Sequence, residues 1–252
     1  MGKRARKHRM DNRHGDDHKG GAVVRALPQQ KGWSPLPQTP EDRSFSYSKQ
    51  IKAKSAGQEA LLAAIDQYNL TLALGPAGTG KTFLAIAKAV EALEAGEVGR
   101  IVLSRPAIEA GESIGYLPGA VEDKLAPYLR PLTDALSDRL SPKRLKALLA
   151  EGVIEIAPVG YMRGRTLNNA FVVIDEAQNC TYAQIKMLLT RLGWRSTMVM
   201  TGDPAQSDLM QGLSGLGEAA EKLETLPDVA VVNLKDKDIV RHPLVASMLT
   251  VL

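Results

Sequence analysis

The sequence predicts an α/β fold in which a mostly parallel sheet carries helices on both faces. From about residue 45 onward, short apolar runs alternate with amphipathic stretches, a pattern typical of strand and helix units that follow one another. Hydrophobic residues make up 44% of the 252 residues, which is enough for a substantial core. In such a sheet, ligands bind beyond the carboxyl ends of the strands, so the loops there should hold the functional residues.

Apolar runs of strand length predict a sheet strand at each of the following positions: Leu70–Leu74, Arg100–Leu103, Val153–Ile156, Phe171–Ile174, Thr197–Met200 and Val229–Asn233. Between and before them, amphipathic or alanine-rich stretches predict helices at Gln58–Gln67, Lys81–Ala95, Val121–Ser137, Pro142–Ala150, Tyr182–Leu192 and Leu213–Thr225. The sequence contains no internal repeat that would favour a solenoid.

A phosphate-binding P-loop follows the first expected strand. The eight residues Gly75-Pro76-Ala77-Gly78-Thr79-Gly80-Lys81-Thr82 complete the pattern G-x-x-x-x-G-K-[ST], and an alanine-rich helix follows them. This short pattern also occurs by chance, but the strand before it and the helix after it favour a nucleotide site. The glycines let backbone N–H groups surround the phosphates of ATP, to which the helix N-terminus adds partial positive charge. Lys81 is expected to neutralise the β- and γ-phosphates, and the Thr82 hydroxyl is expected to bind Mg²⁺.

Two carboxylates end the most apolar run, Phe171–Ile174. Asp175 is expected to hold Mg²⁺ near the P-loop, and Glu176 is expected to orient and deprotonate a water that attacks the γ-phosphate. This arrangement favours hydrolysis over phosphoryl transfer to another substrate. Capping of the next helix is the alternative role for the two carboxylates, and the two roles are compatible.

Two polar positions are expected to complete the nucleotide site. Gln206, in Thr201-Gly202-Asp203-Pro204-Ala205-Gln206, should lie beside the γ-phosphate, although Gly-Asp-Pro is also ordinary turn chemistry. Gln58, before the first strand, has an amide that can both donate to and accept from adenine. A glutamine on a helix is more often a surface residue, so this second signal is weak by itself.

Together these motifs resemble the PhoH family over roughly residues 45–250. The resemblance rests on Gln58, the P-loop and five further segments: Ser104-Arg105-Pro106-Ala107, Gly115-Tyr116-Leu117-Pro118-Gly119, Arg163-Gly164-Arg165-Thr166, Asp175-Glu176-Ala177-Gln178-Asn179 and the segment ending at Gln206. PhoH-like proteins resemble the first motor domain of superfamily 1 helicases and are regarded as ATPases linked to RNA metabolism and phosphate starvation. The resemblance implies a RecA-like P-loop NTPase in which Gln58 contacts adenine and Lys81, Thr82, Asp175, Glu176 and Gln206 form the ATPase site.

Helicases carry a second motor domain that supplies an arginine to the bound ATP, and we expect no second motor-like domain within this length. We therefore expect a homo-oligomer, a ring and by analogy a hexamer, in which a neighbouring subunit supplies that arginine. Arg241 is the first candidate, followed by Arg163 and Arg165. The alternative role of Arg241 is a salt bridge with Asp236 or Asp238. The polar N-terminal segment is too short for the nuclease domain of some relatives.

Arg163 and Arg165 flank a glycine in a loop, an arrangement suited to gripping a phosphate backbone. We expect them to contact single-stranded RNA; a solvated loop is the alternative. Aromatic residues are scarce near these loops, where Tyr116, Tyr128 and Tyr161 are the candidates, so binding should show little sequence preference.

Residues 1–44 carry ten Lys or Arg and five Asp or Glu, which leaves 22 and 23 for the rest of the chain. This segment, with His8, His14 and His18, is expected to be a disordered basic tail before a single P-loop ATPase domain at 45–252. It either attracts nucleic acid or is simply solvated, and a histidine metal site is disfavoured.

No apolar run reaches the ~20 residues of a membrane span, and no apolar signal region follows the basic start. The single cysteine, Cys180, excludes an internal disulfide. We expect a cytoplasmic protein without a membrane partner. The first functional hypothesis is an ATPase, with Mg²⁺ as cofactor, that remodels or unwinds RNA. The alternative is a nucleotide-dependent switch or assembly factor that acts on protein partners, whereas a P-loop kinase is disfavoured because no lid or acceptor pocket is evident.

Overall fold

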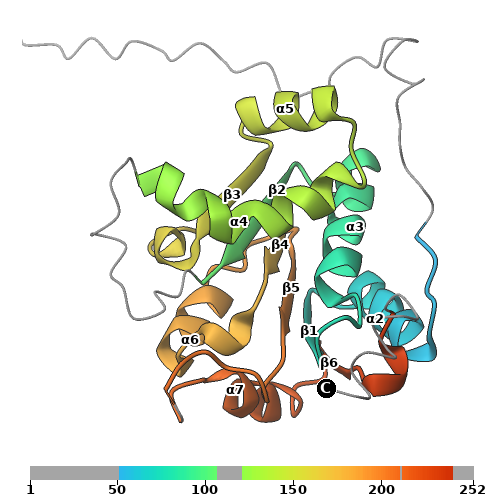
Figure 1. The fold of residues 1–252 in the computed structure, drawn as a ribbon, viewed down its shortest axis with the longest axis vertical. Coiled ribbons are helices and arrows are strands. Elements are labelled where there is room, and N and C mark those ends of the chain that lie inside the picture. The colour runs from blue at the N-terminus through green and yellow to red at the C-terminus, as the bar shows by residue number, and fades with distance from the viewer. Residues whose placement is uncertain (1–50, 107–120, 211, 241–252) are drawn as a thin grey trace, which may run out of the picture. The chain divides into compact units, whose positions relative to one another are not determined.

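The computed structural model describes residues 51–106, 121–210 and 212–240. Its centre is a six-stranded sheet of order β3-β2-β4-β5-β1-β6, and all of its strand pairs are parallel (Figure 1). The strands are β1 (Leu70–Leu74), β2 (Arg100–Arg105), β3 (Ile154–Pro158), β4 (Ala170–Ile174), β5 (Thr197–Gly202) and β6 (Val229–Asn233). The predicted parallel α/β fold is therefore confirmed.

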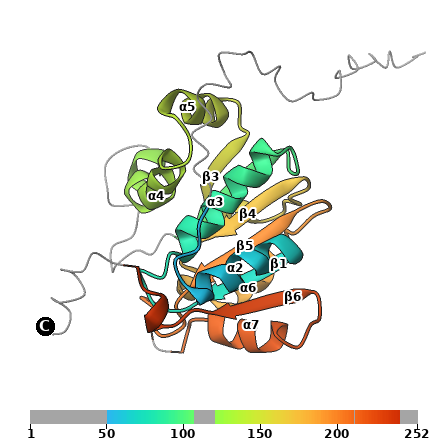
Figure 2. The same ribbon diagram turned by 90° about the vertical axis from the view of Figure 1, so that its right-hand side faces the viewer.

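Helices cover both faces of the sheet (Figure 2). The first face carries α2 (Ala56–Gln67), α3 (Lys81–Glu94), α4 (Val121–Ser137) and α5 (Pro142–Ala150). The second face carries α6 (Tyr182–Leu189), α7 (Leu216–Leu223) and the short 3₁₀ turns η2 (Val159–Met162) and η3 (Ala177–Asn179). A further 3₁₀ turn, η4 (Asp236–Asp238), follows β6. None of the helices in these described ranges is long and apolar enough to cross a membrane.

The two faces have separate cores because side chains alternate along each strand. On β4, Phe171 and Val173 pack with the α2 to α5 face, whereas Val172 and Ile174 pack with the α6 and α7 face. All five residues of β4 are buried, which explains why this strand appears in the sequence as a continuous apolar run. The strand therefore carries the residues after Ile174 to a fixed position at the edge of the sheet.

Two helices are shorter than predicted by more than one residue, each for a local reason. Helix α6 ends at Leu189 because the chain then turns to pair with Leu167, whose N–H donates to the Arg191 carbonyl. Helix α7 begins only at Leu216. Its cap, Gly215, packs so closely against Tyr182 that a Cβ there would overlap the Tyr182 backbone. Strands β2, β3 and β5 each extend two residues beyond their predicted ends.

The thiol of Cys180 is expected to be unreactive in the native protein. Cys180 has no exposed surface, and burial raises its pKa to about 12, so the nucleophilic thiolate is scarce at neutral pH. A maleimide or Ellman-type reagent should label it only after addition of denaturant, and mass spectrometry checks this directly. Because the chain has one cysteine, fast labelling under native conditions would show that this part of the second core opens readily.

Candidate functional site

The P-loop connects β1 to α3, and the Gly75 N–H donates to the Gly202 carbonyl at the end of β5. Gly75 has a φ of 136° and packs against Leu234, whose carbonyl oxygen would overlap a Cβ at this position. Glycine is therefore required where the loop leaves β1. The Lys81 ammonium folds back over the loop and donates to the carbonyl oxygens of Gly75 (2.5 Å) and Pro76 (2.8 Å). Burial lowers the pKa of Lys81, an effect partly opposed by Asp203, Glu176 and Asp175.

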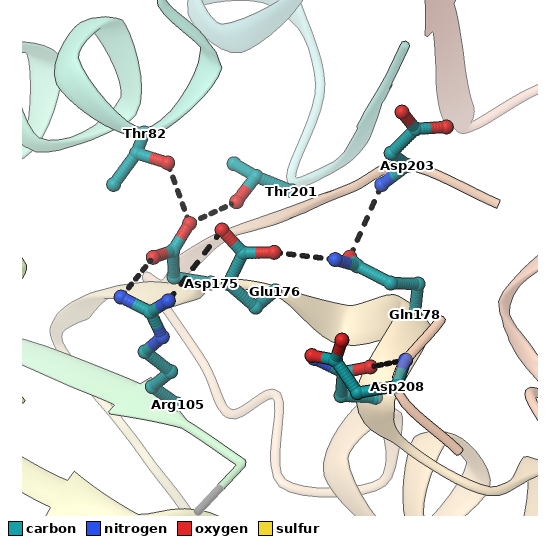
Figure 3. A network of polar contacts seen from close by, with 9 residues as sticks. Thr82, Arg105, Asp175, Glu176, Gln178, Thr201, Asp203 and Asp208 are labelled. Atoms are coloured by element: carbon teal, nitrogen blue, oxygen red, sulfur yellow. Dashed lines mark hydrogen bonds and ion pairs between the residues drawn. The ribbon is translucent and has the colours of Figure 1, made fainter. Parts of the chain in front are cut away.

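Asp175 follows β4 and faces the first turn of α3, as Figure 3 shows. Its Oδ1 accepts hydrogen bonds from the hydroxyls of Thr82 (2.5 Å) and Thr201 (2.7 Å), and the residue is only 2% exposed. The Asp175 N–H donates to the carbonyl of Ser104 at the end of β2. The end of β4, the start of α3 and the end of β5 thus meet at one carboxylate.

Glu176 has an unusual backbone conformation. Its φ of 54° and ψ of 41° are left-handed, which costs about 1–3 kcal/mol for a residue other than glycine. Its carboxylate accepts from the Gln178 amide and lies 3.6 Å from the Arg105 guanidinium, which is also 3.7 Å from Asp175 (Figure 3). The strained turn thus aims the Glu176 carboxylate, and these neighbours hold it there.

Gln178 connects Glu176 to the loop after β5. While its amide nitrogen donates to Glu176, its oxygen accepts from the backbone N–H of Asp203 at 3.1 Å (Figure 3). The residue is 4% exposed. Gln206 lies farther along the same loop, is exposed, and lines the cleft beside the P-loop. Its predicted contact with the γ-phosphate stays a prediction.

These side chains surround a cleft of about 320 Å³. It is lined by Ala77, Gly78, Gly80, Lys81, Thr82, Phe83, Asp175, Glu176, Gln178, Thr201, Gly202, Asp203 and Gln206. No group of three or more His, Cys, Asp or Glu side chains that could hold a metal ion occurs in the described part of the chain. Mg²⁺ does not require such a group, because it takes one or two protein oxygens and completes its shell with phosphate and water. The contact between Thr82 and Asp175 provides two such oxygens side by side.

Gln58, on α2, lies directly against the P-loop and is 4% exposed. Its amide nitrogen donates to the Thr79 carbonyl at 3.0 Å, and its amide oxygen accepts from the Lys54 N–H at 2.8 Å. An amide has two donors and two lone pairs, so these contacts leave one donor and one lone pair for a base. The structure places Gln58 beside the nucleotide loop, and its contact with adenine stays a prediction.

Asp238, in η4, ties the segment after β6 to the start of α2. Its carboxylate accepts from the N–H groups of Gly57 (3.2 Å) and Lys235 (2.9 Å) and is 2% exposed as a residue. Two residues on, the Val240 N–H donates to the Gly78 carbonyl of the P-loop at 2.9 Å. The segment thus supports the nucleotide loop from outside the cleft.

Replacing Asp238 by asparagine is expected to destabilise the protein at neutral pH and hardly at all in acid. The Lys235 N–H, the Ser55 hydroxyl and the Gly57 N–H hold the pKa of Asp238 below its usual value of 3.8. A depressed pKa contributes stability above the unfolded-state value, and this stability is lost as the pH falls through the folded-state value. Melting temperatures of wild type and Asp238→Asn should therefore differ at pH 7 and converge below about pH 4. A constant difference across this range would contradict the assignment.

The predicted RNA-binding arginines differ in their surroundings. Arg165 forms a two-pronged ion pair with Glu155 on β3, with nitrogen to oxygen distances of 2.5 and 2.6 Å. Arg163 is exposed. Its side chain has no hydrogen-bond or ion-pair partner among the described residues. Arg241 lies outside the described residues, as does Tyr116. The roles of these three arginines stay predictions.

Three residues of the site were missed by the sequence-based assignment of functional residues: Arg105, Gln178 and Thr201. Each occurs in a segment that carried the family resemblance, but none was assigned a role. A usable signal exists for Arg105 and Thr201, because both are polar residues at the carboxyl end of a buried strand. Gln178 gives no such signal, since its two partners are known only from the fold.

Comparison with known proteins identifies relatives over most of the chain. The family model described as PhoH-like protein matches residues 50–252. A PhoH-like protein of Bacillus subtilis (strain 168) is 52% identical over 202 residues, which are 80% of this chain and 63% of that protein. Protein PhoH of Escherichia coli (strain K12) is 46% identical over 197 residues, covering 77% of this chain and 56% of that protein. The chain thus spans roughly 60% of the length of these relatives.

Among solved structures, the large terminase of a thermophilic bacteriophage is similar with a TM-score of 0.50. The match covers 80% of this chain and 50% of that chain at 12% sequence identity. At this identity the likeness concerns the fold alone, and it agrees with a RecA-like P-loop NTPase sheet.

Proposed function

The chain belongs to the PhoH-like protein family and is a nucleotide-binding P-loop protein, and from this premise we propose that it hydrolyses ATP in a manner coupled to single-stranded RNA. The observation that supports hydrolysis is the joint placement of Thr82, Asp175 and Glu176 around the cleft beside the P-loop. Both carboxylates come from the end of one buried strand, so their positions are fixed by the fold.

In the proposed reaction, the P-loop N–H groups and Lys81 bind the phosphates, and Gln58 contacts adenine. Thr82 and Asp175 would hold Mg²⁺, which supplies positive charge to the phosphate oxygens. Glu176 accepts a proton from water as the water oxygen bonds to the γ-phosphorus and the bond to the β-phosphate oxygen breaks, which yields ADP and inorganic phosphate. Gln206 senses the γ-phosphate from the loop after β5.

Before this reaction can occur, two contacts seen around the site must change. The Lys81 ammonium has to leave the carbonyls of Gly75 and Pro76 to reach a phosphate. The Glu176 carboxylate, which contacts Arg105 and Gln178, has to turn one oxygen toward water. We propose that Gln178 couples this change to the loop of Asp203 and Gln206, since its amide contacts both sides.

An arginine from a neighbouring subunit is part of the proposal. No arginine occurs among the described residues that line the cleft. Arg105 contacts the carboxylates of Asp175 and Glu176 but is not a lining residue. A head-to-tail ring, with Arg241 as the first candidate, would supply this charge. Sedimentation of the active protein tests it: a monomer with full turnover would disprove the ring.

Steady-state ATP hydrolysis with and without single-stranded RNA is the experiment that tests the function. Turnover that rises with RNA supports an RNA-coupled ATPase, which we place in the cytoplasm. A turnover rate that does not change when RNA is added would favour the nucleotide-dependent switch that acts on protein partners. Absence of any ATP hydrolysis, with ATP still bound, would contradict the enzymatic proposal itself.

A further inference from the structure

Part of the face that carries α6 has only positive charges. Residues 157–174 and 177–202 contain five Lys or Arg and no Asp or Glu. These residues form η2, η3, α6, the strands β4 and β5, and the connections that lead to these strands. The two connections lie side by side, since the N–H groups of Leu167 and Gly193 donate to the carbonyls of Arg191 and Leu167. The cations from both segments therefore belong to one continuous surface.

Not all of these cations are free to bind a ligand. Glu155 on β3 neutralises Arg165 through their two-pronged ion pair, and the guanidinium of Arg191 donates to the Arg165 carbonyl at 2.8 Å. Arg163, Lys186 and Arg195 are exposed. For these three side chains the structure describes no carboxylate partner, so they are the available charges of the surface.

Two strongly exposed aromatic side chains lie on the same surface, each close in sequence to an available arginine. Tyr161 is 60% exposed and precedes Arg163 by two residues, while Trp194 is 87% exposed and directly precedes Arg195. Aromatic side chains of this size are usually packed away from water. An exposed ring beside an arginine is the arrangement with which proteins bind single strands without reading their sequence.

Hydrogen bonds brace the turn that carries Trp194. The Trp194 N–H donates to the Asn168 side chain at 2.8 Å, and the Trp194 carbonyl accepts from the Asn169 N–H at 2.9 Å. Gly193 is confined as well, because a Cβ there would overlap the Asn168 side-chain oxygen. Arg195 has a positive φ of 55°, a conformation that a braced turn can maintain. The indole is thus presented to solvent from a fixed backbone, which lowers the entropy cost of binding.

We propose that this surface, defined by Tyr161, Arg163, Lys186, Trp194 and Arg195, binds single-stranded RNA. Tyr161 and Trp194 stack on bases, and the three cations contact phosphates. Tyr161 follows the carboxyl end of β3 and Trp194 precedes the amino end of β5. The bound RNA therefore crosses the length of a five-residue β-strand, ~17 Å, and the three strand spacings from β3 to β5, ~14 Å, which is roughly 22 Å in all. One end of this track lies at the sheet edge that carries the nucleotide cleft. The inference rests on the proposed coupling of ATP hydrolysis to RNA.

Trp194 itself reports the binding. The chain has two tryptophans, so Trp33→Phe leaves Trp194 as the sole indole in the full-length protein. Titration of this variant with an oligouridine of about 15 nucleotides should quench its fluorescence. In the wild-type background, Trp194→Ala and Tyr161→Ala should each weaken binding about 5- to 150-fold, the range for loss of one stacked base. Arg163→Ala with Arg195→Ala should reduce the slope of log K against log salt by roughly 1.4, about 0.7 for each phosphate contact.

A matched control comes from the opposite face. Lys143 and Lys146 are exposed on α5. The Lys143→Ala, Lys146→Ala double variant should bind the oligouridine as the wild type does. Because the basic residues before position 45 are the same in every variant, they cannot produce a difference. Thermal melting of each variant confirms that it is folded.

The possible failures are distinguishable. Wild-type protein that does not bind the oligouridine would overturn both this surface and the RNA part of the proposed function. Wild-type binding that Trp194→Ala, Tyr161→Ala and the arginine variant leave unchanged would overturn the surface alone. Unchanged RNA affinity together with a smaller sedimentation coefficient for Trp194→Ala would also overturn it and would identify Trp194 as a contact between copies of this chain.

Discussion

Replacing Lys81 by alanine is expected to reduce ATP hydrolysis about 10²–10³-fold, the effect of removing one preorganised donor from a developing charge. Lys81 is the one lysine that lines the cleft in the described part of the chain, and it is placed to neutralise the β- and γ-phosphates. A steady-state phosphate-release assay measures the loss. Lys88→Ala is the matched control, because Lys88 lies on the same helix and its ammonium pairs instead with Asp66 (2.6 Å) and Glu91 (2.7 Å).

The loss should be catalytic and not structural. Without Lys81, the loop loses donors to the carbonyls of Gly75 and Pro76, both partly exposed groups that water can reach. The substitution also removes a buried positive charge, and burial disfavours the charged form of Lys81. This second effect opposes the loss of the two hydrogen bonds. The melting temperature should therefore stay near that of the wild type. Turnover within about threefold of the wild type in a folded Lys81→Ala protein would contradict the assigned role.

Local sequence patterns predict the part of the site that depends on chain neighbours. The P-loop residues are consecutive, and Asp175 and Glu176 directly follow β4, so strand, turn and helix patterns are sufficient to place each group at the carboxyl edge of the sheet. The same reasoning predicts the position of every strand, because each contains a short apolar run, and β1 and β4 are buried at all five positions. Family membership and the α/β fold inferred in this way are both confirmed.

Contacts between distant residues could not be predicted in the same way. Arg105 reaches Asp175 and Glu176 only because β2 is the neighbour of β4 in the sheet. The pairing of Arg165 with Glu155 likewise depends on how the chain returns from β3 toward β4. A sequence pattern shows that an arginine is near a glycine in a loop, but not which carboxylate the fold brings to it. Arg163 and Arg165 therefore look equivalent in the sequence and differ in the structure.

Replacing Glu176 by glutamine is expected to slow hydrolysis about 10²–10⁴-fold while ATP still binds, because an amide of the same shape cannot accept the proton of the attacking water. Lys81, Thr82 and Asp175 are untouched, so binding of a fluorescent ATP analogue should stay within about threefold of the wild type. Single-turnover hydrolysis then isolates the chemical step. Glu218→Gln is the control, since Glu218 pairs with Lys222 on the surface of α7. Equal loss of binding and hydrolysis would mean that Glu176 holds the loop through Arg105 and Gln178 and does not act on water.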